Sequence, residues 1–459
     1  MKDKIAPLFK FDALLLQQGW LKPAFVGVSA EGTIEFLSDR PPEGARGMES
    51  VSGIALPGFP NAHSHAFQYA MAGMAEKHKP GTDDDFWSWR EAMYECALSL
   101  NPDQIEAVAA MVYAEMLRHG YTHVAEFHYL HHDAQGRPYK NLAETGERLL
   151  AAAEHAGIRI TLIPVFYQKG GFGKEPEPRQ RRFILSRPED YLKLLDATRA
   201  AVSKSKNAQL GFGVHSLRAV TASDVTAVFE SGPKDLPFHI HAAEQRREVE
   251  DCKAFLKCRP VEWLLENLPL QERFNLVHCT HLSDSEVKRL ANSGAQVVVC
   301  PGTEGNLGDG IFRLKDYANH YGNLCIGTDS HISLNPLEDI RWLDYAQRLT
   351  SHKRNTFDDA STVFLTKCIS GGRRAMGWAD QNFFETGRPF DAVIFRSDSP
   401  LLNTAREEHI LSSILYTSDS ADIMGTIVDG RWVVKEGITQ NGTAIRRNFA
   451  RALKELSNK

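Results

Sequence analysis

The middle of the chain alternates between short apolar runs and longer amphipathic stretches. Asn101 can cap a helix that has Pro102 at its first position, and apolar side chains then recur on one face until Gly120. Further helical patterns cover 142–155, Pro188–Val202, 261–268 and 283–293. Strand-like runs cover 54–65, 122–127, Arg159–Phe166, 210–215, Phe238–Ala242, 274–279, 296–300 and 323–327. Eight strands with helices between them predict an α/β fold, a parallel (β/α)8 TIM-like barrel.

The two ends of the chain have a different pattern, in which short strand-like runs are separated by turns. Asp429-Gly430 between apolar runs is a strong hairpin signal. The other strand-like runs lie at 25–28, 33–37, 390–395, 426–428 and 431–434. Because chain ends are often close in space, we predict one small β-sandwich-like domain built from both of them. The predicted division is residues 1–57 and 386–445 for this domain, 58–385 for the barrel and 446–459 for a C-terminal helix.

Composition narrows the class of protein. The 459 residues are 42% hydrophobic and 24% charged, and the formal net charge is -5. This balance argues against nucleic acid or an anionic membrane as a partner. We find no signal-peptide pattern and no apolar run long enough to span a membrane. The seven cysteines are scattered without a C-x-x-C pair, which favours a reducing, cytoplasmic location over a zinc ribbon or a disulfide framework.

Polar residues follow the apolar strands in order along the chain. His63 and His65 are two residues apart, so on one strand they point to the same face. His241, His278 and Asp329 each follow a later strand. In a barrel the carboxyl ends of the strands carry the catalytic groups. Taken singly, each residue could equally be a core histidine or a turn aspartate, but the ordered series predicts one site.

Imidazoles and a carboxylate suit a borderline divalent metal, Zn²⁺ first. Water on such a metal can reach a pKa of about 7. Glu244, three residues after His241, can move protons nearby, although a glutamate in a first helical turn would look the same. His278 or His281 could assist the water, and the strand pattern leaves both open.

Longer strings carry a family resemblance. PNAHSHAF, HIHAAE, VHCTH and GTDSH resemble the amidohydrolase superfamily, in its deaminase branch, over nearly the whole chain. HSHAFQ, FWSWRE, EFHYLHH, GVHSLRAV, CPGTEGNLGDGIF and GTDSHISLNPLEDIRWL are similar to its N-formimino-L-glutamate deiminase family. That family usually has Arg at Tyr69, and Thr and Ala at Gly302 and Gly305. These departures flank the expected site.

The resemblance implies hydrolysis of N-formimino-L-glutamate to N-formyl-L-glutamate and ammonia, by a homodimer. It implies one Zn²⁺ per subunit, with Fe²⁺ or another divalent ion as alternatives. The implied metal ligands are His63, His65, His241 and Asp329. The implied catalytic residues are Glu244, His278 and Asp329. The implied substrate-binding residues are Gln68, Arg90, Tyr129 and Arg218. The guanidinium group of an arginine can bind a carboxylate through two parallel hydrogen bonds, so two arginines suit the two carboxylates of this dianionic small molecule.

Three alternatives stay open. One is another mononuclear deaminase that acts on a nucleobase or a related amidine. A two-metal hydrolase would need a lysine at a strand end, where this chain has His215 and then Arg218. The third is a non-catalytic barrel that binds an anion. We also predict that residues 86–89 form a packing cluster or cover the site. The polar stretch 169–188 is expected to be a solvated loop, with closure over an anionic ligand as its alternative.

Overall fold

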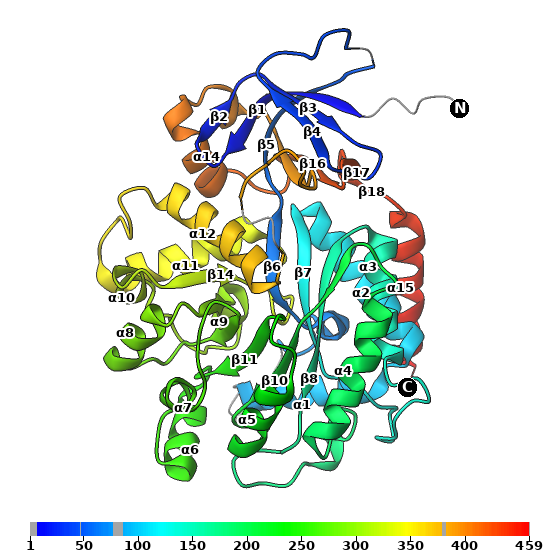
Figure 1. The fold of residues 1–459 in the computed structure, drawn as a ribbon, viewed down its shortest axis with the longest axis vertical. Helices are drawn as coiled ribbons and strands as arrows, with labels where there is room; N and C mark the ends of the chain where they lie inside the picture. Colours follow the sequence, from blue (N-terminus) through cyan, green and yellow to red (C-terminus); the bar gives the residue numbers. More distant parts are fainter. Residues whose placement is uncertain (1–6, 46, 77–85, 379–381, 459) are drawn as a thin grey trace.

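The computed structural model describes residues 7–45, 47–76, 86–378 and 382–458, which form a barrel and a small sheet above it (Figure 1). The barrel strands run in the order β14-β13-β12-β11-β10-β8-β7-β6, and all neighbouring pairs are parallel. Their bounds are β6 (Phe59–Ser64), β7 (Tyr121–His128), β8 (Arg159–Phe166), β10 (Phe212–Ser216), β11 (Phe238–Ala242), β12 (Phe274–His278), β13 (Gln296–Val299) and β14 (Asn323–Ile326), with the short β9 (Ala208–Leu210) beside β8.

The barrel closes through the segment that follows β14. Ser64 and Asp329 form a parallel bridge. The backbone N–H groups of Thr328 and Asp329 donate to the carbonyl oxygen of His63 at 3.1 and 3.0 Å, and His65 N–H donates to Asp329 O at 3.2 Å. The predicted (β/α)8 barrel is therefore confirmed, and its closing seam runs through three of the expected metal ligands.

Helices follow the barrel strands as predicted. Helix α2 (Pro102–Arg118) begins with a reciprocal cap, in which Asn101 Oδ1 accepts from Gln104 N–H at 2.9 Å and Gln104 Oε1 accepts from Asn101 N–H at 3.0 Å. Gly120 follows its end at φ +91°. The other helices are α1 (Phe86–Ser99), α3 (Glu144–Ala156), α4 (Pro188–Val202), α5 (Ala222–Ser231), α6 (Arg246–Leu256), α7 (Pro260–Asn267), α8 (Asp284–Asn292), α9 (Pro301–Asn306), α10 (Leu314–Asn319), α11 (Pro336–Ser351), α12 (Ala360–Ala375), α13 (Pro400–Asn403), α14 (Ile410–Thr417) and α15 (Gly442–Ser457).

Both chain ends contribute to the small sheet, as expected. Its order is β18-β17-β16-β15-β5-β1-β3-β4, with β2 beside β1, and only the β1–β5 pair is parallel. A Cβ on Gly32 would lie 2.5 Å from Asp429, so the β3–β4 turn contacts the β16–β17 turn and the single sheet bends over its own core. The strands are β1 (Leu8–Leu16), β2 (Gly19–Leu21), β3 (Ala24–Val28), β4 (Ile34–Ser38), β5 (Glu49–Pro57), β15 (Ala392–Arg396), β16 (Ile423–Val428), β17 (Arg431–Lys435) and β18 (Ile438–Thr439).

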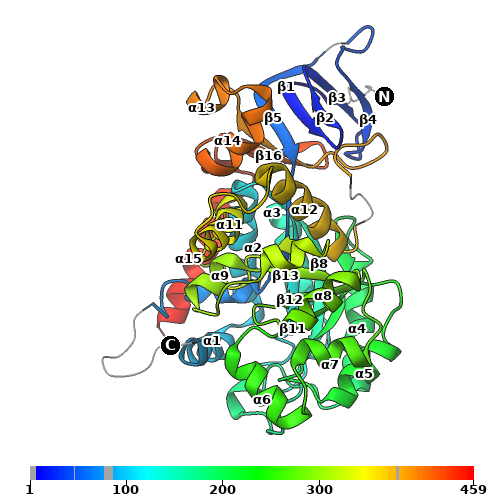
Figure 2. The same ribbon diagram turned by 90° about the vertical axis from the view of Figure 1, so that its left-hand side faces the viewer.

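The C-terminal helix α15 returns to the barrel and packs beside α2, where Gln104 Nε2 donates to Glu455 at 3.0 Å (Figures 1 and 2). The residue limits predicted for the three parts of the chain stay a prediction. Among the described residues, every helix is too short or too polar to cross a bilayer.

The stretch after β8 differs from the expected solvated loop. Gln180 and Arg182 are fully buried. Arg182 donates to the carbonyl oxygens of His132 at 2.8 Å and Leu100 at 2.7 Å, and Gln180 Nε2 donates to Tyr94 Oη at 2.9 Å. The expectation was wrong for these two residues, because carbonyl and phenol oxygens replace the water that a polar side chain loses on burial.

Candidate active and metal site

Four side chains converge at the carboxyl end of the barrel. The Nε2 atom of His63 lies 3.0 Å from that of His65 and 3.1 Å from that of His241. Asp329 Oδ1 lies 3.1 Å from His65 Nε2 and 3.6 Å from His63 Nε2. All four side chains are buried, and their ligand atoms lie within 4.8 Å of one another. The structure thus brings the complete predicted ligand set together.

The neighbouring backbone decides which nitrogen atoms face this centre. His65 Nδ1 lies 2.9 Å from the carbonyl oxygen of Phe127, and His241 Nδ1 lies 3.0 Å from that of His215. A carbonyl oxygen only accepts, so both Nδ1 atoms carry the proton and both Nε2 atoms keep a lone pair. Burial also lowers the pKa of His63 to about 3, which leaves this imidazole neutral at pH 7.

These lone pairs repel one another unless a cation lies between them. Burial lowers the pKa of His241 well below its usual value. Burial would raise the pKa of Asp329, but the imidazoles of His63 and His65 beside it hold this pKa well below its usual value. Three neutral nitrogens and one ionised oxygen are the donors that a zinc-like divalent ion prefers. The residues present therefore fit a divalent metal.

Strained backbone accompanies the site. Asp329, His278 and Ala243 have φ values of +51°, +70° and +53°. Residues other than glycine and asparagine rarely adopt this left-handed backbone conformation. Where they do, they concentrate at functional sites. Here the strain lies at the ends of β11, β12 and β14, where the site is assembled.

A second group of charges lies against the first. His278 Nε2 is 3.8 Å from Glu244 Oε1 and 3.8 Å from Asp329 Oδ2, and its Nδ1 is 3.2 Å from Glu304 Oε1. Burial alone would lower the pKa of His278, but these three carboxylates raise it to about 10. His281 instead directs Nε2 to the backbone oxygen of Asp309 at 2.9 Å. Of the two histidines left open by the sequence, His278 faces the site.

Cys300 also lies within ligand distance of His278 and Asp329. Burial raises the pKa of its thiol well above the usual value. A protonated thiol is a poor metal ligand. This group is therefore a weaker metal candidate than the three-histidine cluster.

One cavity joins this cluster to the expected substrate residues. Gln68, Arg90, Tyr129 and Arg218 all line it, together with His65, His241, Glu244 and Asp329. Gln68 Nε2 donates to Tyr129 Oη at 3.2 Å, and Arg218 Nη2 donates to Glu244 Oε2 at 3.2 Å. Arg90 Nε is buried without a hydrogen-bond partner. All four substrate-binding residues expected from the resemblance thus line one cavity beside the metal-ligand cluster.

Residues 86–89 begin helix α1 and both pack together and cover the cavity. The rings of Phe86 and Trp87 lie 5.1 Å apart, and Phe86 and Trp89 line the cavity.

Sequence patterns assign no role to four further residues at the site. Tyr167 and His215 line the cavity, Glu304 contacts His278, and Glu248 Oε2 lies 3.7 Å from Arg218 Nη1. His215 follows a strand and could have been noticed on that ground. Glu248 and Glu304 look like ordinary helix glutamates in the sequence, and only the packing reveals them.

Comparisons with known proteins agree with this geometry. A family model described as "Amidohydrolase family" matches residues 54–433. A curated formimidoylglutamate deiminase of Pseudomonas aeruginosa is 42% identical over 447 residues, which cover 96% of this chain and 98% of the relative. The crystal structure of an amidohydrolase from Brucella melitensis has a TM-score of 0.91 at 38% identity and covers 98% of this chain and 100% of its own. A zinc-bound adenosine deaminase from Xanthomonas campestris has the same fold, with a TM-score of 0.82 at 20% identity and coverage of 99% of both chains.

Proposed function

We propose, from the premise that this chain belongs to the amidohydrolase family, that it hydrolyses N-formimino-L-glutamate to N-formyl-L-glutamate and ammonia. The proposal rests on the similarity of nearly the whole chain to a formimidoylglutamate deiminase. The site agrees with this activity, because two arginines lie beside a cluster of metal ligands. The reaction belongs to histidine breakdown. It adds water across a C=N bond and releases the imino nitrogen as ammonia.

The proposed metal is one Zn²⁺ per subunit, held by His63, His65, His241 and Asp329. A divalent ion there would supply a Lewis acid that makes water reactive near neutral pH. Neutral imidazoles support this role, since burial keeps the pKa of His63 at about 3.

We assign substrate binding to the arginine side of the cavity. Arg90 and Arg218 would take the two carboxylates through bidentate hydrogen bonds. Arg90 Nε has no partner to lose when a carboxylate arrives. Gln68 and Tyr129, already joined at 3.2 Å, would orient the formimino group by hydrogen bonds.

Three side chains handle the water and its protons. Asp329 would take the proton from the attacking water, and the protonated His278, whose Nε2 lies 3.8 Å from Asp329 Oδ2, would donate a hydrogen bond to that water. Glu244 Oε1, 3.8 Å from His278 Nε2, would give a proton to the departing nitrogen. Water oxygen bonds to the formimino carbon, the carbon–nitrogen bond breaks, and the nitrogen leaves as ammonia.

The same cavity is less suited to a nucleobase. Aromatic faces such as those of Phe86 and Trp89 line the cavity, but Arg90 and Arg218 also bring two guanidinium groups to it, which suit a dicarboxylate better than a flat uncharged ring. We further propose that the enzyme is a cytoplasmic homodimer, as the family resemblance implies.

An ammonia-release assay tests the proposal. The purified protein should release ammonia from N-formimino-L-glutamate, lose the activity with a chelator and regain it with Zn²⁺. Guanine, cytosine and adenosine serve as comparison substrates. Faster turnover of any of these, or full activity without metal, would contradict the proposal.

A further inference from the structure

A second cavity adjoins the active-site cavity, and the solvent-exposed Phe255 is part of its lining. We call it the outer chamber and define it by Trp87, Lys174 and Arg247 together with Arg90 and Arg218, which line both cavities. The two shared arginines make the chamber continuous with the proposed substrate site. Any ligand in the chamber therefore lies beside the groups that would bind the substrate.

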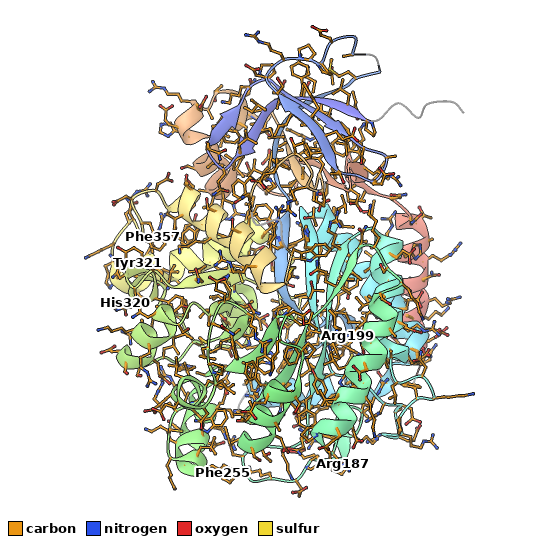
Figure 3. The ribbon with its side chains drawn as sticks, viewed as in Figure 1. Arg187, Arg199, Phe255, His320, Tyr321 and Phe357 are labelled. Carbon is orange, nitrogen blue, oxygen red and sulfur yellow. The ribbon has the colours of Figure 1, made fainter. Side chains whose placement is uncertain are left out.

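Three separate elements enclose the chamber. Helices α1 and α6 lie at the end of the barrel away from the small sheet (Figures 1 and 2). The loop after β8 reaches α6, because the rings of Phe172 and Phe255 lie 6.1 Å apart and a Cβ on Gly173 would come 2.8 Å from Phe255. Figure 3 labels Phe255 at this lower end of the molecule. The loop for which solvation or closure over an anionic ligand was expected thus forms one wall of a chamber.

Cations gather around one aromatic ring in this chamber. The guanidinium carbons of Arg90, Arg247 and Arg218 lie 4.5, 4.8 and 5.9 Å from the ring centroid of Trp87. Cation–π attraction to the Trp87 ring offsets part of the mutual repulsion of the arginines. An anion placed among them would remove the rest of that repulsion.

Acidic residues do not cancel this charge. Three acidic side chains line the chamber, and each lies near an arginine: Glu177 near Arg179 at 2.9 Å, Glu248 near Arg218 at 3.7 Å and Asp251 near Arg247 at 3.8 Å. In the part of the chain that the structure describes, Lys174 and Arg90 have no carboxylate at ion-pair distance. The chamber therefore keeps an excess of positive charge.

We propose that the outer chamber is an anion-binding subsite that receives the dicarboxylate substrate before it reaches the metal cluster. Arg247 and Lys174 hold one carboxylate at the entrance, and the dianion then passes to Arg90 and Arg218. This inference rests on the proposed function for the identity of the substrate. A cationic entrance raises the local concentration of an anion and its association rate, and this effect falls with ionic strength.

Salt-dependent kinetics test the subsite. In Arg247→Gln and in Lys174→Gln, kcat/KM should fall about three- to tenfold at low ionic strength while kcat stays unchanged. The difference should shrink near 1 M salt, where the Debye length is about 3 Å. Arg246→Gln removes the same charge from the adjacent position of α6, outside the chamber lining, and should lower kcat/KM less than either chamber variant. Wild-type kcat/KM and salt dependence in both chamber variants would overturn the proposal.

Glutarate, an unreactive dicarboxylate, separates the two proposals. If the wild type releases no ammonia from N-formimino-L-glutamate, the proposed function fails, and glutarate binding still tests the chamber. Calorimetry at low salt should show about three- to tenfold weaker glutarate binding to Arg247→Gln than to the wild type and to Arg246→Gln. Equal affinities in the three proteins would overturn the subsite.

Discussion

Two buried clusters of charged side chains lie at opposite ends of the barrel strands, and they are built differently. At the amino end, Arg159 Nε donates to Asp391 Oδ2 at 2.6 Å and its Nη2 bonds Asp429. His123 Nε2 lies 3.6 Å from the same Asp391 carboxylate. Burial would raise the pKa of Asp391, but Arg159 and His123 lower it below its usual value. This cluster holds its own counter-charges and joins the barrel to the small sheet.

The cluster at the carboxyl end lacks that internal balance. The Nε2 atoms of His63, His65 and His241 crowd together and share one carboxylate, Asp329. Arg90 Nε and His278 Nε2 are buried there without a hydrogen-bond partner. Burial is similar at the two ends, so burial does not identify the functional site. What distinguishes the functional end is the convergence of three imidazole nitrogens and one carboxylate oxygen on a single point, an arrangement that suits an added cation.

Removing a metal ligand should give the largest effect. His241→Ala deletes one converging nitrogen, so the folded protein should lose its bound metal and its turnover should fall to background. Metal analysis after gel filtration, with the ammonia assay, measures both. His239→Ala, on the same strand, is the matched control, since His239 Nε2 faces the backbone oxygen of Ala375 at 2.9 Å. If His241→Ala kept its metal, the carboxyl-end cluster would not be the metal site.

Glu244→Gln should give the next largest effect. It keeps the metal ligands and removes the group that would protonate the departing nitrogen, so kcat should fall about 10²- to 10⁴-fold with metal content unchanged. Glu250→Gln, an exposed change on the neighbouring helix α6, should behave as the wild type. Full turnover in Glu244→Gln would remove this residue from the mechanism.

Arg159→Met tests the other half of the comparison. It leaves the buried Asp391 carboxylate without its main counter-charge, so the free energy of unfolding should fall by about 3–5 kcal/mol. Because the cluster lies at the far end of the barrel, kcat per bound metal should not change. Urea unfolding and the ammonia assay give the two numbers.

Arg289→Met is the matched control for that variant. It removes an exposed ion pair with Glu266 and should move the unfolding midpoint little. A strong loss of kcat in folded Arg159→Met would show that the two ends of the barrel are not independent.

The comparison also explains what the sequence could predict. The strand periodicity located the barrel, and the order of His63, His65, His241 and Asp329 along the strands located one site. The periodicity of apolar residues and the order of the histidines along the chain can both be read from the sequence itself, so no structure is needed to recognise them. Polar residues at the other ends of the strands, such as His123, did not stand out because their partners come from the small sheet.

Long-range packing accounts for the rest. In the sequence, Arg182 looks like a charged residue of a solvated loop. It is buried in the structure because backbone carbonyl oxygens from distant segments accept its hydrogen bonds. In the sequence, Glu304 looks like an ordinary residue of a short helix. It contacts His278 because the helix that follows β13 lies beside the end of β12. No local pattern encodes such contacts.

Glu304→Gln should give the smallest effect and sharpens the comparison within the site. Glu304 Oε1 lies 3.2 Å from His278 Nδ1 and accepts from Cys300 N–H at 2.8 Å. Glutamine can still accept from Cys300, so the variant removes the charge and keeps the shape. We expect kcat to fall about 10- to 100-fold, as for other residues that orient a catalytic group, with metal content and KM little changed.

The charge also has a spectroscopic signature. Glu304 is one of three carboxylates that raise the pKa of His278 to about 10. Removing it should therefore move the titration of His278 to lower pH, which NMR of the metal-free protein measures. A purely structural role would leave that titration in place while lowering the free energy of unfolding. Unchanged kcat together with an unchanged titration would mean that His278 is positioned by the strained backbone of β12 alone.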